Sequence, residues 1–474
     1  MLTLADILEA LTGFRLKRLS QEIEEAIIDS RQVIPGSLFI AMVGEHVDGH
    51  DYIQEAFNHG ASVALVQRDL PDTYPVVDLR GDGFLNELAA LSNTPFCLRV
   101  ADSLHALQQI ARYWRRKIDL KVIGITGSVG KSTTKEVIAE VLSKRYSTLK
   151  NPGNLNNEIG LPLTLLRLKE DHERAILEMG FYIPGEIAFL CDLALPHIGV
   201  ITNIGIVHAE RAGSQEAIAK GKAELVQALP PAPEGVAILN YDDPWVRKMS
   251  QLTRAKVFYY GLDPRSDIWA DGVEGLGLEG IRFRLHYRNE VFHIRVPLIG
   301  RHSVHTALRA TAVGLMEGLT WQEIISGLRS GQTQLRLVAV KSRSGALILD
   351  DTYNASPQST LAALNLLEEL DGRKVAVLGD MLELGKYESQ GHEMVGMRAA
   401  EVVDELVTIG DRGKMIASSA LRAGLKRNLI TILGNNQQAI EFLQKRIGEG
   451  DVVLVKGSHG MNMDLIVSAL EGRE

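Results

Sequence analysis

The sequence lacks the features that mark membrane, secreted and nucleic-acid-binding proteins. No run of apolar residues approaches the roughly 20 needed to cross a bilayer, so we expect no stable membrane insertion. Two cysteines, Cys97 and Cys191, are too few for a disulfide framework or a four-cysteine metal site. The net charge of −8 disfavours nucleic acid, because a phosphate backbone requires a basic face. The opening "MLTLADILEALTGFRL" lacks the basic start and apolar core of a signal peptide, so we expect a cytoplasmic protein.

Strand-like and helix-like segments alternate along the 474 residues, which is enough chain for roughly three domains of about 150 residues. We place these domains at residues 1–100, 101–330 and 331–474. The alternation predicts an α/β protein with a mostly parallel, doubly wound sheet in the middle block. Polar–apolar alternation over residues 266–296 predicts antiparallel hairpins at one edge of that sheet. Five further strands in the last block predict a second sheet of the nucleotide-binding type.

A glycine loop follows the strand "KVIGIT" and precedes a helix predicted over residues 131–144. The stretch "GITGSVGKSTTKEV" lacks the first glycine of the usual phosphate-loop pattern, where Ile125 stands. The geometry survives this change, because consecutive N–H groups and the helix dipole still converge on one point. Lys131 can reach terminal phosphates, and the Ser132 hydroxyl can bind Mg²⁺. An ordinary capped turn is the alternative, and the order of strand, loop and helix favours a phosphate site.

A second glycine pattern, "GLGLEG" at residues 275–280, matches the dinucleotide-binding motif letter by letter. An alternating strand, "IRFRLHY", follows it, and no helix follows to hold a pyrophosphate. We therefore predict a hairpin turn here, which disfavours a dehydrogenase.

Acids and an imidazole stand where three strands end. Glu178 ends "RAILE", and His208 lies just past "VITNIGIV". In a parallel sheet both would lie at the carboxyl edge, where a metal ion could bind beside the phosphate loop. In "LDDTYNASPQS", Asp350 and Asp351 end a strand before a helix that begins at Pro357. Acids placed in this way suit a ribose hydroxyl, and a turn with a helix cap is an equal alternative.

With these motifs in place, the chain resembles the Mur ligases over nearly its whole length. The resemblance rests on eight segments in order: "DSRQVIPGSLFIAMVGEHVDGHDYI", "GITGSVGKSTTKE", "NPGNLNNEIGLPLTLLRL", "ILEMGFYIPGEI", "VITNIGIVH", "LDDTYNASPQST", "VLGDMLELG" and "VLVKGSHGM". It implies three domains: an N-terminal domain for the UDP precursor, a central ATPase-like domain, and a C-terminal Rossmann-like domain. It also implies an ATP-dependent ligase that activates a carboxylate as an acyl phosphate. Its expected partners are UDP-N-acetylmuramoyl-tripeptide and D-alanyl-D-alanine, and the enzyme is expected to be a monomer.

The resemblance also implies roles for individual residues. Lys131, His208 and Lys222 would be catalytic, and Lys222 matches a lysine that is carbamylated in the family. Ser132 and Glu178 match ligands of a first Mg²⁺, whereas His208 matches a ligand of a second. The remaining implied contacts are Thr126, Gly127, Ser128, Val129, Gly130, Thr133, Arg336, Asp350 and Tyr353 for ATP, and Ser30, Arg31, Gly49, Asn156 and Asn157 for the substrates.

Several positions depart from the family pattern. Ser303 stands in "GRHS" where the family often has Asn, which concerns the adenine contact. His459 stands in "KGSHG" where the family favours Arg, which concerns the dipeptide's carboxylate. "VHAERAGS" and "FYIPGEI" also differ from the family's usual segments.

Two other functions remain open from the sequence. One is the neighbouring ligase that adds a single amino acid; its diaminopimelate-using members carry D-N-P-R in the last domain, whereas the similar string here, "LDPRSD", lies in the middle block. The other is a catalytically silent regulator that binds ATP without turnover. A folate polyglutamate ligase is disfavoured, because the first block resembles a UDP-sugar domain.

Overall fold

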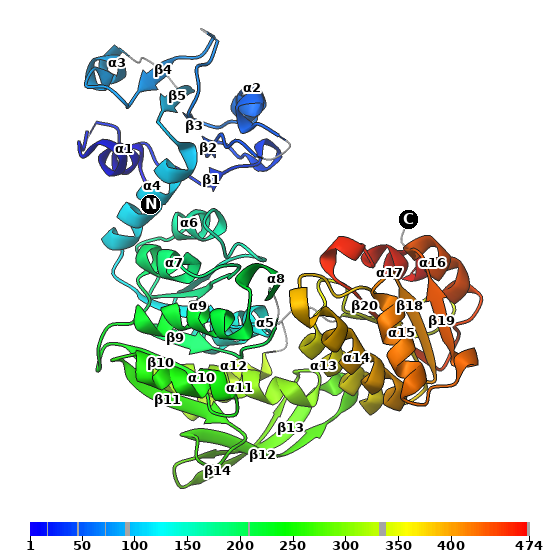
Figure 1. Ribbon diagram of the computed structural model, residues 1–474. Coiled ribbons are helices and arrows are strands. Elements are labelled where there is room, and N and C mark those ends of the chain that lie inside the picture. Colours follow the sequence, from blue (N-terminus) through cyan, green and yellow to red (C-terminus); the bar gives the residue numbers. More distant parts are fainter. Residues whose placement is uncertain are drawn as a thin grey trace. The chain divides into compact units, whose positions relative to one another are not determined.

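The computed structural model describes residues 1–16, 18–44, 47–71, 73–90, 95–206, 209–330 and 338–471 (Figure 1). The chain forms two compact units. The first comprises Met1–Gly124, Tyr146–Gly180 and Glu186–His197, and the second comprises Ile125–Arg145, Phe181–Gly185 and Ile198–Glu474. The middle block therefore contributes to both units, and the boundaries after residues 100 and 330 stay a prediction. No helix within the described ranges is long and apolar enough to cross a membrane.

The first unit begins with a five-stranded sheet in the order β1-β2-β3-β5-β4. All four neighbouring pairs are parallel. The strands are β1 (Ala26–Ile27), β2 (Leu38–Ile40), β3 (Val63–Val66), β4 (Val76–Asp78) and β5 (Phe96–Arg99), and the helices are α1 (Leu4–Thr12), α2 (Ile53–Asn58) and α3 (Phe84–Ala90).

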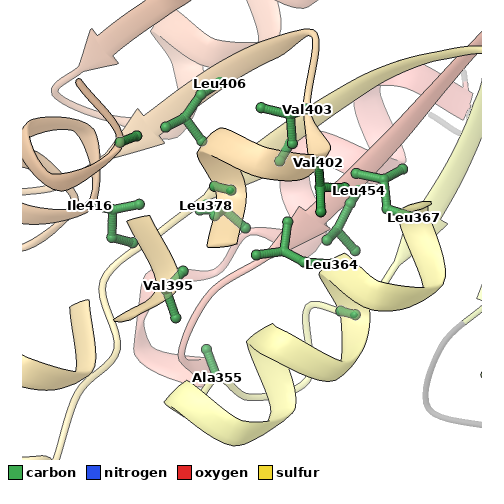
Figure 2. Close-up of a cluster of buried hydrophobic side chains, with 14 of the residues drawn as sticks. Ala355, Leu364, Leu367, Leu378, Val395, Val402, Val403, Leu406, Ile416 and Leu454 are labelled. Carbon is green, nitrogen blue, oxygen red and sulfur yellow. The ribbon is translucent and has the colours of Figure 1, made fainter. Parts of the chain in front are cut away.

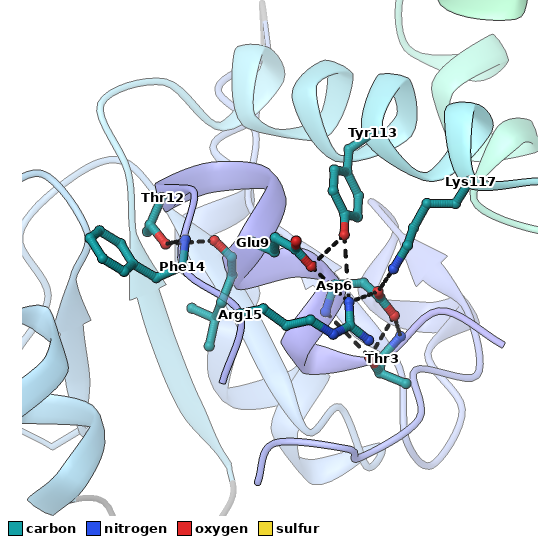
Figure 3. Close-up of polar contacts among 9 residues, drawn as sticks. Thr3, Asp6, Glu9, Thr12, Phe14, Arg15, Tyr113 and Lys117 are labelled. Carbon is teal, nitrogen blue, oxygen red and sulfur yellow. Dashed lines mark hydrogen bonds and ion pairs between the residues drawn. The ribbon is translucent and has the colours of Figure 1, made fainter. Parts of the chain in front are cut away.

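Helix α1 is bound to helix α4 (Ser103–Lys117) by a network of charged groups (Figure 3). Asp6 is buried, and its Oδ1 accepts hydrogen bonds from Arg15 and Lys117, each at 2.6 Å. Burial alone would raise the pKa of Asp6, but the bonds from Lys117, Thr3 and Arg15 outweigh burial and lower it to about 2. The ionised carboxylate of Asp6 therefore stabilises the folded state at neutral pH.

The middle block begins in the first unit with β6 (Lys121–Thr126). Lys121 N, the first N–H of β6, donates to Glu173 O (3.2 Å). Glu173 directly precedes β8 (Arg174–Glu178), and β8 pairs in parallel with β7 (Thr148–Lys150). Helices α6 (Gly160–Leu165) and α7 (Glu186–Ala194) complete this part. The end of β6 lies in the second unit, where Thr126 O accepts from Thr202 N (3.0 Å). Strand β6 therefore runs from one unit into the other.

Within the second unit, strands β9 to β12 pair in parallel in sequence order, and β12, β13 and β14 pair antiparallel. This confirms the edge hairpins, and "GLGLEG" is the turn between β12 and β13, with no helix after it. The strands are β9 (Ile198–Ile201), β10 (Val236–Asn240), β11 (Lys256–Gly261), β12 (Ile268–Gly275), β13 (Ile281–Tyr287) and β14 (Glu290–Val296). The helices are α5 (Lys131–Leu142), α8 (Ala209–Ala212), α9 (Gln215–Gln227), α10 (Pro244–Lys248), α11 (Val304–Met316) and α12 (Trp321–Arg329).

The last block forms a six-stranded sheet in the order β15-β16-β20-β17-β18-β19. All five predicted strands are present and parallel, and β15 is an additional antiparallel edge strand. The strands are β15 (Val338–Lys341), β16 (Leu347–Asp350), β17 (Arg373–Leu378), β18 (Glu405–Ile409), β19 (Ile430–Leu433) and β20 (Asp451–Lys456). The helices are α13 (Pro357–Glu369), α14 (Glu388–Val402), α15 (Gly413–Arg422), α16 (Asn436–Gln444) and α17 (Asp464–Glu471).

The two faces of this sheet carry separate apolar cores. Along β20, Val452 and Leu454 belong to one core, whereas Val453 and Val455 belong to the other. This division follows from the two-residue period of a strand. Figure 2 shows the first core, in which Leu364 of α13 and Val395 of α14 pack toward Leu378 of β17 and Leu454. Helices α16 and α17 cover the other face, so the sheet is doubly wound as predicted.

Candidate active site

The glycine loop turns sharply between β6 and α5. Gly127 has a φ of +148°, and a Cβ at this position would lie 1.8 Å from Thr202 Oγ1. Gly130 is the N-cap of α5 and has a φ of +82°, in the left-handed region. Both positions therefore require glycine, one for space and the other for backbone conformation. The predicted loop and helix are confirmed, although α5 ends at Leu142, two residues earlier than expected.

The loop is held by the segment that follows β9. Ser128 N donates to Asn203 O (2.9 Å), and Val129 N donates to Asn203 Oδ1 (3.0 Å). Gly205 N donates to Ser128 Oγ (2.8 Å), and Thr202 Oγ1 donates to Val129 O (2.8 Å). These four bonds place the loop backbone without a ligand, so the loop is preorganised for binding.

Two lysines meet at one carbonyl oxygen of the loop. Lys131 Nζ donates to Gly127 O (3.0 Å), and Lys222 Nζ donates to the same oxygen (3.1 Å). Lys222, on α9, is only 1% exposed, and its Nζ lies 4.7 Å from the centre of the Phe181 ring. Two lysine side chains are therefore close neighbours at this carbonyl oxygen, and Lys222 is almost fully buried.

A cavity of about 420 Å³ opens in front of the loop, within the second unit. One wall consists of the glycine loop, residues 128–133, and the start of α11. The other wall consists of residues 351–359 at the end of β16 and the start of α13, together with Lys456. The sequence-predicted residues Ser128, Val129, Gly130, Lys131, Ser132, Thr133 and Tyr353 all line this cavity. Thr126 is fully buried behind it at the end of β6.

The two acids at the end of β16, Asp350 and Asp351, have different partners. Asp350 Oδ1 accepts from Thr352 N (3.1 Å) and Thr352 Oγ1 (2.7 Å), the turn that was the alternative interpretation. Asp351 lines the cavity and forms an ion pair with Lys456 (2.7 Å), whose Nζ also donates to Asn354 O (2.7 Å). Lys456 is 2% exposed. Asp351 and Tyr353, rather than Asp350, therefore border the cavity directly.

The first unit holds the other predicted metal and peptide residues. Glu178 ends β8 with 1% exposure, and its Oε1 accepts from Asn156 Nδ2 (2.9 Å). The structure thus brings these two predicted residues together. Asn157 Oδ1 accepts from Ile159 N (3.3 Å) and Gly160 N (2.8 Å), so its side chain holds the turn that precedes α6.

The three predicted uridine-pocket residues lie near 3₁₀ turns of the first sheet. Ser30 is buried, and its Oγ donates to Glu55 Oε2 (2.8 Å). Arg31 has an 80% exposed side chain that pairs with Asp29 (2.7 Å). Gly49 N donates to Met42 O (2.7 Å), and a Cβ on Gly49 would lie 2.8 Å from Met42 N. Glycine is therefore required at residue 49 for packing.

Two predicted residues, His208 and Arg336, lie outside the described residues. The structure describes two of the residues that depart from the family pattern, Ser303 and His459. Ser303 lines the cavity and donates from Oγ to Ile299 O (2.7 Å). His459 lies edge-on to Tyr353, with ring centres 6.3 Å apart.

Three further residues of the site were not predicted from the sequence: Asn203, which holds the loop; Lys456, which holds Asp351; and Arg309, which lines the cavity from α11. For Arg309 a signal exists, because a single arginine in the apolar helix "VHTALRATAVGLM" is unusual unless it has a partner. For Asn203 and Lys456 the signal is weak, since each role depends on residues distant in the sequence.

A glycine loop between a parallel strand and a helix defines the class of P-loop proteins, here with an additional α/β sheet at the same cavity. Models of protein families identify which P-loop family the chain matches. Residues 22–91 match "Mur ligase family, catalytic domain", residues 125–314 match "Mur ligase middle domain", and residues 335–459 match "Mur ligase, glutamate ligase domain". The chain belongs to the Mur ligase family, as its motifs predict.

Known proteins are similar over nearly the full length. The UDP-N-acetylmuramoyl-tripeptide--D-alanyl-D-alanine ligase of Bacillus subtilis is 35% identical over 446 residues, which are 93% of this chain and 92% of that protein. A crystal structure of MurF from Acinetobacter baumannii has a TM-score of 0.83 at 30% identity, covering 99% of this chain and 98% of that one. MurF ligase from Thermotoga maritima in complex with ADP has a TM-score of 0.78 at 27% identity, covering 98% of each chain.

Proposed function

We propose that this chain is an ATP-dependent ligase that joins D-alanyl-D-alanine to UDP-N-acetylmuramoyl-tripeptide, the reaction named for the Bacillus relative. The observation that carries this proposal is the match over 93% of the chain, which includes all three blocks and not the nucleotide loop alone. The cavity between the loop and the third sheet supports it, because a nucleotide there would contact both. Closure of the third domain over the middle one would then complete the site.

The chemistry required is activation of a carboxylate. A carboxylate is a poor electrophile near neutral pH, so the γ-phosphate of ATP is transferred to it, which forms an acyl phosphate. The amine of the dipeptide attacks the acyl carbon, and phosphate leaves through a tetrahedral intermediate. The protein's contribution is to position the reactants and to stabilise negative charge during phosphoryl transfer.

We assign the phosphates of ATP to residues 126–133. Ser128 and Val129 are already held by Asn203, and Lys131, at the first position of α5, can move from Gly127 O to the terminal phosphates. Tyr353 lines the third-sheet wall and is assigned to the nucleoside, and Asp350 is assigned to the same region, where its carboxylate shapes the turn. Arg336 remains a proposed contact to the γ-phosphate, since a guanidinium suits that role.

We further propose that Lys222 is carbamylated in the active enzyme. Two ammonium groups beside Gly127 O repel each other, and water screens this repulsion poorly around a lysine that is 1% exposed. When the neutral Lys222 amine attacks CO₂ and loses a proton, it becomes an anionic carbamate. That anion would pair with Lys131, and its remaining N–H could still donate to Gly127 O.

Magnesium, when bound, would supply positive charge that offsets the charge of the transferring phosphoryl group. Among the described residues, no three His, Cys, Asp or Glu side chains form a metal-binding group. The proposed ligands are instead the Ser132 hydroxyl, the Glu178 carboxylate and the Lys222 carbamate, all oxygen donors of the type that Mg²⁺ prefers. His208 stays a predicted ligand of a second ion.

The remaining assignments concern the acceptor substrate and the state of the protein. Ser30, Arg31 and Gly49 are proposed for the uridine nucleotide, and Asn156 and Asn157 for the peptide. Of these, Arg31 has the most exposed side chain and can turn from Asp29 toward a ligand. We also propose that the enzyme works as a monomer in the cytoplasm.

A matrix of substrates tests the function. The purified chain is given ATP and Mg²⁺ with UDP-N-acetylmuramoyl-tripeptide, in its diaminopimelate and lysine forms, and with dipeptides or single amino acids. We expect phosphate release only when the nucleotide-peptide and D-alanyl-D-alanine are both present. Equal turnover with a single amino acid would indicate the neighbouring ligase. ATP binding without cleavage under all conditions would indicate a silent regulator.

A further inference from the structure

Arg309 is an arginine of the nucleotide cavity whose role no motif explains. It lies in the second turn of α11, is 4% exposed, and lines the cavity together with Gly130 and Lys131. Its Nη2 lies 3.5 Å from the point that a Cβ on Gly130 would occupy. The guanidinium therefore reaches the N-terminal end of α5, beside the phosphate loop.

The polar contacts of Arg309 do not neutralise its charge. Its Nη2 donates to Thr306 Oγ1 (2.8 Å), and its guanidinium carbon lies 5.6 Å from the centre of the Tyr260 ring. Its Nε is buried and has no hydrogen-bond partner in the part of the chain that the structure describes. Among the residues that the structure describes, no carboxylate lies within ion-pair distance of this guanidinium. A buried charge without an anion is costly, so an anion must be supplied from elsewhere.

The cavity points to the source of that anion. We propose that Arg309 binds the phosphate chain of the nucleotide, adding a cation on α11 to the one that Lys131 supplies on α5. The planar fork of the guanidinium suits two phosphate oxygens, and the unpartnered Nε provides a further donor. This inference rests on the proposed nucleotide site, but it does not depend on which amide bond the enzyme forms.

Binding measurements on the full chain test this role. ADP with Mg²⁺ is titrated calorimetrically, and adenosine, which has no phosphate, is followed by ligand-observed NMR. Arg309→Met keeps similar volume and removes the charge, and we expect it to weaken ADP on the order of 10- to 100-fold and to leave adenosine unchanged. Arg309→Lys should lie between wild type and Arg309→Met. The matched control is Arg329→Met, which removes the same charge from an exposed position at the end of α12.

Three outcomes would overturn the inference. Unchanged ADP affinity in Arg309→Met would indicate that Arg309 has only a structural role. An equal loss of affinity for ADP and for adenosine would indicate that Arg309 contacts the nucleoside and not the phosphates. A wild-type chain that binds no ADP would remove both this role and the nucleotide site. Thermal unfolding without ligand separates folding from binding, since removal of an uncompensated charge should keep or raise the melting temperature of Arg309→Met. A chain that binds ADP through Arg309 yet releases no phosphate would refute the ligase reaction and leave this inference standing.

Discussion

The two walls of the cavity beside the glycine loop are held in place by different kinds of bond. In the loop wall, Ser128 N and Val129 N donate to Asn203, and glycines at 127 and 130 permit the turn. In the third-sheet wall, the segment after β16 is held by the ion pair of Asp351 with Lys456, whose Nζ also donates to Asn354 O. The first wall depends mainly on backbone conformation, and the second depends on one charge pair whose lysine is buried.

This difference determines which substitutions each wall tolerates. A backbone-held loop tolerates most side chains but not an added Cβ at a position with no space. A wall held by a buried ion pair is sensitive to the loss of either partner, because the remaining charge is left buried. The loop wall also has Lys222 behind it, so its electrostatics depend on the chemical state of that lysine.

The largest effect is expected behind the loop wall. Lys222→Ala should lower the rate of phosphate release about 1,000-fold, because it removes the proposed carbamate ligand. Short carboxylic acids should partly restore the rate, since they can occupy the space of the carbamate. Lys220→Ala, two residues away on the exposed face of α9, is the matched control and should retain full activity. Undiminished turnover in Lys222→Ala would remove the carbamate from the mechanism.

A substitution at a glycine of the loop should have the second-largest effect on activity. Gly127→Ala places a Cβ 1.8 Å from Thr202 Oγ1 and should displace the loop, lowering activity about 100-fold. Gly424→Ala is the control, because Gly424 also has positive φ (+108°), but no described residue beyond its chain neighbours has an atom within 4 Å of the point that its Cβ would occupy. Steady-state phosphate release and ADP titration measure both variants. Equal activity of the two would show that the loop wall is not held by this close approach.

A substitution in the third-sheet wall should change both the free energy of unfolding and the KM for ATP. Asp351→Asn leaves Lys456 buried without its anion, so we expect a loss of about 3 kcal/mol in the free energy of unfolding. The KM for ATP should rise about 10-fold with a smaller change in kcat, because Tyr353 in this wall is a proposed contact of the nucleoside. Urea unfolding and ATP titrations provide the two readouts. A change confined to stability would mean that this wall does not contact the nucleotide.

The smallest effect on activity is expected at Asp6, which belongs to the first unit and lines neither wall. Because the pKa of Asp6 is lowered to about 2, its contribution is complete above pH 4 and is lost as the pH falls toward 2. Asp6→Asn should cost about 2 kcal/mol at pH 7, and this cost should shrink as the pH falls through that range. Urea unfolding at pH 7, 4 and 3 measures it, with kcat unchanged at pH 7. A cost independent of pH would show that the ionised carboxylate is not the source.

The glycine loop, the five strands of the last sheet and the hairpin at "GLGLEG" could all be predicted from the sequence. In each case the decisive residues are contiguous, so local backbone preference and strand periodicity suffice. The family resemblance follows from the same kind of signal, because its motifs are short segments in a fixed order.

Which of two similar residues borders the site depends on contacts that no local pattern in the sequence specifies. Asp351 lines the cavity and Asp350 forms a turn, because Lys456, more than 100 residues later, lies beside Asp351. Strand β20 enters between β16 and β17, and no local pattern specifies that order. Arg309 becomes a candidate phosphate ligand because α11 brings it to Gly130. Such roles arise from contacts between segments that are distant in the sequence. These contacts exist only once the chain has folded.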